Sequence, residues 1–166
     1  FADSALEKYM TGFARKSDAV FTARLNDGTP YLLVSGWVGG DEVIQPALDF
    51  IDENADSASM IVDVRVNGGG DELLARQVAG CFLSTKAVYS KNRSVSPGSA
   101  TGFTDVFERV VEPNKDRKHF AGKVAVLMGP RCMSSNESFL LMMRQSPNCK
   151  LIGARSRGSS GNPQPH

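Results

Sequence analysis

The alternation of hydrophobic and polar segments along the chain predicts strands separated by helices. Apolar runs cover residues 60–66 and 123–128, and a shorter run covers residues 150–153. Residues 72–83 and 136–146, which follow the first two runs, have the length and periodicity of helices. Strands that alternate with helices are typical of a mostly parallel sheet. We therefore expect an α/β fold in which strands 60–66 and 123–128 are neighbours.

The first third of the chain is expected to contain a helix, a hairpin and a second helix. Apolar residues recur at helical spacing in segment 5–16 and predict a short amphipathic helix. Two apolar segments, residues 20–25 and 31–37, flank the turn-forming sequence Asn-Asp-Gly-Thr at 26–29 and predict a hairpin. Residues 41–54 begin with two acidic residues and carry an apolar stripe, which predicts a helix.

Residues 84–118 show no clear periodicity, so we interpret them as a long loop with one short helix near residues 103–111. No internal repeat or linker divides the sequence, which predicts a single domain over residues 1–166. The sequence starts at Phe1 without an initiator Met and stops at His166 within a Gly/Pro/Ser-rich run. We therefore interpret it as a piece excised from a longer protein.

The composition is that of a globular protein, with 41% hydrophobic and 22% charged residues. The 19 Lys and Arg residues nearly balance the 18 Asp and Glu residues, so we expect no nucleic-acid partner. No apolar run approaches the roughly 20 residues that span a membrane. The two histidines and three cysteines lack ligand spacing, so we expect no metal and no organic cofactor. A disulfide between Cys132 and Cys149 stays open.

Residues 68–70 are three consecutive glycines that directly follow the strand 60–66 and one asparagine. Such a turn lets backbone amides converge and bind negative charge, which in an acyl-transfer enzyme is the oxyanion of a tetrahedral intermediate. The alternative is a tight strand-to-helix turn that needs glycine only for steric reasons. A phosphate loop is disfavoured because the Gly-Lys-Ser/Thr element is absent. We expect Asp63 and Arg65 to pair with each other or with nearby backbone, in a structural role.

Two serines, Ser134 and Ser135, lie between strand 123–128 and the helix that follows it. Ser134 with Glu137 three residues later fits a capping box, in which the Ser134 hydroxyl satisfies a free amide of the helix. The alternative is a nucleophilic Ser134 whose oxyanion is stabilised by the Ser135 amide and the helix dipole. Because sites of parallel sheets lie at the carboxyl ends of the strands, we expect Ser134 and the glycine turn at one edge.

Three segments resemble the tail-specific, or carboxyl-terminal-processing, serine peptidases (S41-like). Residues 60–70, MIVDVRVNGGG, resemble the family's IIDLRxNGGG signature. Residues 134–137, SSNE, resemble its SASE element, and residues 153–160, GARSRGSS, stand in the place of its GExTxGKG element. The resemblance extends from about residue 28 to residue 164. It implies a crotonase-like α/β core, with a mostly parallel sheet, an N-terminal hairpin and flanking helices.

The same resemblance implies a serine-type peptidase (hydrolase). Ser134 would be the nucleophile, and the oxyanion hole would be formed by Gly68, Gly69 and Gly70 with the Ser135 amide. The substrate would be a peptide or an unfolded protein. A cell-envelope or secreted location is implied by the resemblance alone.

The general base of the family is missing at its expected positions. Peptidases with a Ser-Lys dyad carry the lysine 25 residues after the serine, where this chain has Ser159. Gln164 corresponds to the family's orienting glutamine only if one residue is inserted. The tricorn-like branch uses a histidine where this chain has Leu33. His119 is expected to be a solvated surface residue in a basic stretch, and His166 is the terminal residue.

Three accounts of the function follow from the missing base, because general-base assistance is worth about 10²- to 10⁴-fold. The first is a serine peptidase whose base lies outside this sequence. The second is an inactive homologue that binds peptides or small apolar ligands in the same cleft. The third is activation of Ser134 by Ser159 or another nonstandard partner. We favour the first because both the serine and the glycine turn are retained. We also expect the Ser159 hydroxyl at the edge of the cleft that contains Ser134.

Overall fold

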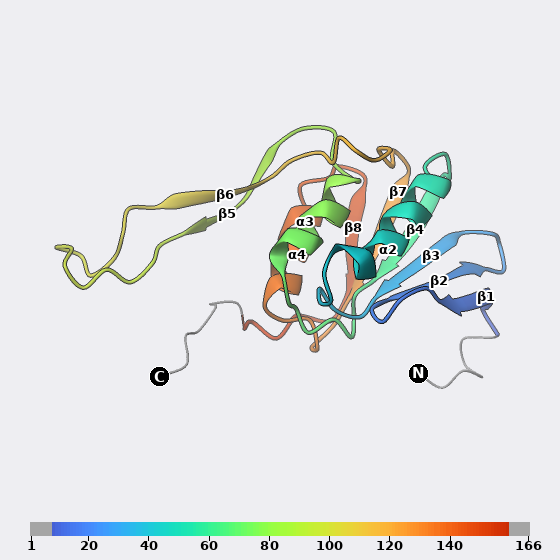
Figure 1. Cartoon of the computed structure of the whole chain (residues 1–166), viewed down its shortest axis with the longest axis horizontal. Helices are drawn as coiled ribbons and strands as arrows, with labels where there is room; N and C mark the ends of the chain where they lie inside the picture. Colours follow the sequence, from blue (N-terminus) through green and yellow to red (C-terminus); the bar gives the residue numbers. More distant parts are fainter. Residues whose placement is uncertain (1–7, 160–166) are drawn as a thin grey trace.

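A computed structural model describes residues 8–159 and shows a mixed α/β fold (Figure 1). In chain order the elements are β1 (Met10–Arg15), β2 (Val20–Leu25), β3 (Pro30–Val34), α2 (Asp41–Glu53), β4 (Ser59–Asp63), α3 (Glu72–Gly80), β5 (Ala87–Asn92), β6 (Phe107–Val111), β7 (Lys123–Met128), α4 (Ser135–Met143) and β8 (Cys149–Gly153). The predicted hairpin, the three helices expected after it and the three expected strands are found close to their predicted bounds.

One six-stranded sheet, in the order β1-β2-β3-β4-β7-β8, organises the fold. Strands β3, β4, β7 and β8 are parallel, whereas β1 and β2 join one side of the sheet in antiparallel orientation. The prediction that strands 60–66 and 123–128 are neighbours in a mostly parallel sheet is confirmed, since Ile61 lies opposite Ala125. The carboxyl ends of β4 and β7, and the loops that follow them, therefore lie side by side.

The three helices pack on one face of the sheet. Strand residues such as Leu32, Val62 and Val126 share one buried apolar cluster with residues of α2, α3 and α4. The opposite face carries a smaller cluster around Tyr31 and Leu33, drawn from the first four strands and Val66. Burial of apolar surface contributes about 25 cal/mol per Å², so the larger cluster holds the helices against the strand ends.

Segment 5–16 does not form the predicted helix. Met10–Arg15 is strand β1, which pairs with β2, and residues 5–7 lie outside the described residues. The ring of Phe13 stacks on that of Phe21 with 5.7 Å between centroids. Apolar residues at helical spacing thus pack on a neighbouring strand, because pairing with an available strand outweighs a short local pattern.

The short helix expected near residues 103–111 is also wrong. Phe107–Val111 is strand β6, which pairs with β5 in an antiparallel ribbon that extends away from the sheet (Figure 1). Several large apolar residues of the ribbon are exposed: Val88, Val95, Phe103, Val106 and Phe107. Since solvent reaches much of the ribbon, its sequence lacks the apolar alternation of a half-buried strand.

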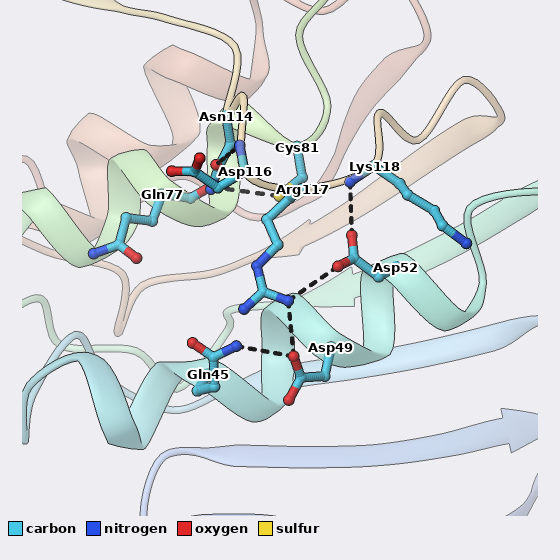
Figure 2. Close-up of polar contacts among 9 residues, drawn as sticks. All are labelled: Gln45, Asp49, Asp52, Gln77, Cys81, Asn114, Asp116, Arg117 and Lys118. Carbon is cyan, nitrogen blue, oxygen red and sulfur yellow. Dashed lines mark hydrogen bonds and ion pairs between the residues drawn. The ribbon is translucent and has the colours of Figure 1, made fainter.

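The segment after β6 is fastened to two helices (Figure 2). Arg117 Nη1 lies 2.8 Å from Asp49 Oδ1 and 3.0 Å from Asp52 Oδ2, both on α2. The amide of Lys118 donates to Asp52 Oδ1 over 2.8 Å. On the other side, Asn114 Nδ2 donates to the carbonyl of Gln77 on α3 over 3.1 Å. These contacts return the chain from the ribbon to the start of β7.

The three cysteines are free thiols, so the disulfide considered between Cys132 and Cys149 is not formed. Burial raises the pKa of Cys81 and of Cys149 to about 12. Among residues 8–159, no helix is long and apolar enough to cross a membrane. The same part of the chain holds no group of three or more His, Cys, Asp or Glu side chains that could bind a metal ion.

Candidate active site

The strand that leads into the glycine turn ends in an ionic cluster around a buried carboxylate. Asp63 is fully buried, and it accepts hydrogen bonds from the Tyr31 hydroxyl and from Arg65 Nη2, each over 2.6 Å. Burial and the neighbouring Asp63 carboxylate raise the pKa of Tyr31, so its hydroxyl stays protonated and donates. The expected Asp63 and Arg65 pair is therefore present. The hydrogen bond from Tyr31 to Asp63 links the ends of β3 and β4.

The glycine turn is fixed from both sides. The amide of Gly69 donates to Asn67 Oδ1 over 2.9 Å, and the amide of Trp37 donates to the Gly69 carbonyl over 2.9 Å. Gly69 has a φ of +102°, and a Cβ placed on it would lie 2.7 Å from the Cβ of Ser134. A Cβ on Gly70 would collide with the Trp37 carbonyl. Glycine is thus required here on steric grounds, and the turn lies directly beside Ser134.

Ser134 does not act as the predicted helix cap. It occupies the N-cap position of α4, but its side chain makes no capping hydrogen bond. The expected capping box is wrong because Glu137 Oε1 accepts from the amide of Gly158 over 2.7 Å instead. Ser134 has a φ of 54° and a ψ of −131°, and it is the only non-glycine residue with positive φ among residues 8–159. Such backbone strain, at a cost of order 1–3 kcal/mol, clusters at functional sites.

The backbone amides of Gly68, Gly70 and Ser135 have no acceptor among residues 8–159, and of these three residues Gly70 and Ser135 line the same cavity as Ser134. The Ser135 hydroxyl donates to the Gly70 carbonyl, which ties the two segments together. The amide of Gly69, by contrast, donates to Asn67 Oδ1. The arrangement thus offers the amides of Gly70 and Ser135, together with the positive end of the α4 dipole, to a developing negative charge.

Ser134 opens into a cavity of about 610 Å³. Ser135 and Ser138 lie in the same wall, the start of α3 supplies Asp71 and Glu72, and the opposite wall belongs to the ribbon. Burial raises the pKa of Glu72, but hydrogen bonds from Tyr89 and Ser138 and the Arg109 charge outweigh it and leave the pKa below its usual value. Glu72 is therefore an ionised, fully engaged carboxylate and a weak base.

Ser159 lies beside Ser134 through its backbone. The amide of Ser134 donates to the Ser159 carbonyl over 2.8 Å, and the amide of Arg157 donates to the Cys132 carbonyl over 2.9 Å. Residues 157–159 therefore run alongside residues 132–134. Ser159 is exposed and is not among the residues that line the cavity.

The other candidate bases remain apart from Ser134 or outside the described residues. His119 is exposed, as expected of a solvated surface residue. Gln164 and His166 lie outside residues 8–159. The structure thus brings together Ser134, Ser135 and the glycine turn, and it places Ser159 next to them.

No sequence pattern indicates the ribbon wall of the cavity, which includes Arg93, Phe107 and Arg109. These residues belong to the segment interpreted as a loop, and only the three-dimensional course of the ribbon places them near Ser134. Ser138 could have been found, because it lies four residues after Ser134 and therefore on the same side of α4.

Comparisons with known proteins bear on this site. The sequence matches peptidase family S41 over residues 29–166. No curated protein matches the sequence. Among solved structures, a candidate peptidase from Parabacteroides merdae superimposes with a TM-score of 0.78 and 24% identity, over 90% of this chain and 47% of that one.

Two further solved structures are similar. The photosystem II D1 C-terminal processing protease has a TM-score of 0.61 and 18% identity, over 79% of this chain and 31% of that one. Mature CPAF complexed with lactacystin has a TM-score of 0.73 and 11% identity, over 92% of this chain and 44% of that one. At these identities the similarity establishes the fold. The chain spans less than half the length of the three solved structures.

Proposed function

The chain belongs to peptidase family S41, and from this premise we propose that it is a serine peptidase domain of the tail-specific type whose nucleophile is Ser134. One observation carries the proposal. Ser134 has a strained backbone and a hydroxyl that caps no amide, and it lies against Gly69 at the floor of a cavity. A serine needed only to begin a helix would use its hydroxyl to cap it.

The proposed reaction is acyl transfer. Ser134 Oγ attacks the carbonyl carbon of the peptide bond, and its proton passes to a general base and then to the departing amine. The amides of Gly70 and Ser135 stabilise the oxyanion, a contribution of about 10²- to 10³-fold for one such donor. Water then releases the acyl group from Ser134. The base is supplied from outside residues 8–159, and the proposed substrates are unfolded proteins or carboxyl-terminal segments.

A second candidate function is peptide binding without hydrolysis. It is favoured by two observations: Ser159 stands in the place of the dyad lysine, and Glu72 is held by Arg76, Arg109 and Tyr89. A hydroxyl cannot replace an amine of lowered pKa as a base. The same cleft would then hold a peptide while leaving it intact.

A fluorophosphonate probe distinguishes the two functions, because it reacts only with an activated serine. We expect the probe to label the full chain and to lose its target in Ser134→Ala. Ser94→Ala is the matched control, since Ser94 lines the same cavity from the ribbon. Labelling that persists in Ser134→Ala would remove Ser134 from the role of nucleophile. Peptide binding with no labelling would favour the second function.

A further inference from the structure

The ribbon wall of the Ser134 cavity contains two arginines in different situations. Arg109 Nη2 pairs with Glu72 Oε2, and its guanidinium carbon lies 5.8 Å from the centre of the Tyr89 ring. Arg93 is exposed and forms no salt bridge with any of residues 8–159. The cavity wall therefore offers one cationic group that no carboxylate of residues 8–159 neutralises.

The carboxylates of the wall do not compensate for Arg93. Glu72 is neutralised twice, by Arg109 and by Arg76, whose Nη2 lies 3.0 Å from Glu72 Oε1. The Asp71 carboxylate accepts the amide of Leu73 over 2.8 Å and caps helix α3. Two arginines and two carboxylates therefore line the cavity, and Arg76, which does not line it, also pairs with Glu72. Arg93 is the lining arginine without a salt bridge among residues 8–159, and its charge adds to the free amides beside Ser134.

We propose that Arg93 forms a carboxylate-binding subsite in the Ser134 cavity, so that the preferred peptides carry a carboxylate near the bond that Ser134 attacks. This inference rests on the proposed function, because it places the peptide in that cavity. A guanidinium matches a carboxylate in geometry and binds it through two parallel hydrogen bonds. The exposed ring of Phe107 in the same wall provides apolar surface for the neighbouring part of the peptide.

A peptide can present this carboxylate from two sources, its own carboxyl terminus or an Asp or Glu side chain. Both are planar anions of the same size at the recognised group, and Arg93 binds either by the same contacts. The sources differ in where the peptide backbone continues. A set of matched peptides therefore separates them.

The test measures binding of four fluorescent forms of one short peptide by anisotropy: free acid or amide at the carboxyl terminus, each with an internal Asp or Asn. The full chain carries Ser134→Ala in every sample, so that no peptide is cleaved. We expect the best acidic form to bind about 5- to 10-fold more tightly than the form without carboxylates. Arg93→Met should abolish this difference and Arg93→Lys should keep part of it. Higher salt should reduce it.

Lys123→Met is the control, because it also removes one exposed positive charge but lies at the amino end of β7, at the opposite edge of the sheet. It should keep the preference for the acidic form. Equal binding of all four peptides, equal losses in the two Met variants, or no binding at all would overturn the inference. The proposed function is tested separately, by probe labelling of the Arg93→Met chain in which Ser134 is present. If no probe labels Ser134 but the preference for the acidic peptide is retained, only the peptidase proposal is refuted.

Discussion

The backbone amide of Ser134 donates a hydrogen bond to the carbonyl of Ser159 over 2.8 Å. The residue that stands in the place of the dyad lysine is therefore the immediate neighbour of the proposed nucleophile. If Ser159 corresponds to the lysine as the resemblance implies, a hydroxyl stands next to Ser134 where the family has an amine that accepts a proton. Whether an amine at this position activates Ser134 can therefore be tested by substitution of Ser159.

Ser159→Lys should increase fluorophosphonate labelling of Ser134. The amine acts as a base only when it is neutral, and at an exposed position its pKa stays near the ordinary value of about 10.4. The increase should therefore grow with pH toward about 10. Labelling rates measured across this range in Ser159→Lys and in Ser159→Met, which has a similar length and no amine, provide the comparison. A folded Ser159→Lys chain that labels no faster than Ser159→Met would favour the binding function.

Gly69→Ala should destabilise the fold by about 2 to 4 kcal/mol and abolish labelling of Ser134. The new methyl group would lie 2.7 Å from the Ser134 Cβ and 2.8 Å from the Met133 carbonyl oxygen, at a φ of +102°. Urea denaturation measures the free energy of unfolding. Gly28→Ala is the matched control, because Gly28 has a φ of +86° and nothing within 4 Å of an added Cβ. It should cost only about 1 kcal/mol and leave labelling intact.

Arg117→Met should lower the free energy of unfolding by about 1 to 2 kcal/mol. The side chain of Arg117 is only 18% exposed and bridges Asp49 and Asp52, which would be left facing each other (Figure 2). Arg117→Lys, which keeps the charge, should recover part of the loss. Asp49→Asn should cost less than Arg117→Met, because Asp49 is half exposed and Asp52 keeps its partner. Equal stability of Arg117→Met and the unchanged chain in urea would contradict a fastening role.

Alkaline pH should destabilise the fold through its buried thiols. Burial raises the pKa of Cys81 from about 9 to about 12, so between these values the unfolded chain loses a proton that the folded chain retains. The free energy of unfolding should then fall as pH rises, by about 1.4 kcal/mol per pH unit for this thiol. Cys149 and Tyr31 act in the same direction.

Cys81→Ala should therefore show a shallower decline than the unchanged chain, whatever its stability at neutral pH. Urea denaturation under reducing conditions at several pH values between about 8 and 11 gives the two slopes. The same slope in both proteins would mean that the Cys81 thiol ionises as easily in the folded state as in the unfolded state.

The sequence predicts the central fold well because its elements are buried on one or both sides. Residues 60–66 and 123–128 carry continuous apolar runs, and these runs become the adjacent strands β4 and β7. Strand β1 has no such pattern, since most of its residues are exposed and its pairing with β2 is the main source of its conformation. The ribbon was missed for the same reason. Elements held by pairing alone leave little hydrophobic signal.

The candidate site was predicted in position but not in its contacts. Parallel strands placed Ser134 and the glycine turn at one edge, as expected from topology. The capping box failed because Glu137 has a partner in Gly158, which is close to it only in the folded chain. A four-residue pattern cannot reveal a competing partner 21 positions away. The ribbon wall with Arg93 could not be inferred, because no local pattern shows where a long ribbon folds back.

The pairing of β4 with β7 also sets the time at which the site can form during synthesis. The glycine turn leaves the ribosome first, and α3, the whole ribbon and the loop around Arg117 must follow before β7 and Ser134 exist. Closing so long a loop is slow, because its entropy is lost before the strand contacts form. A growing chain therefore carries the turn without Ser134 beside it while the segment between them is made. The order of the elements thus keeps the proposed nucleophile and its glycine turn apart until α3, the ribbon and the loop around Arg117 have been synthesised.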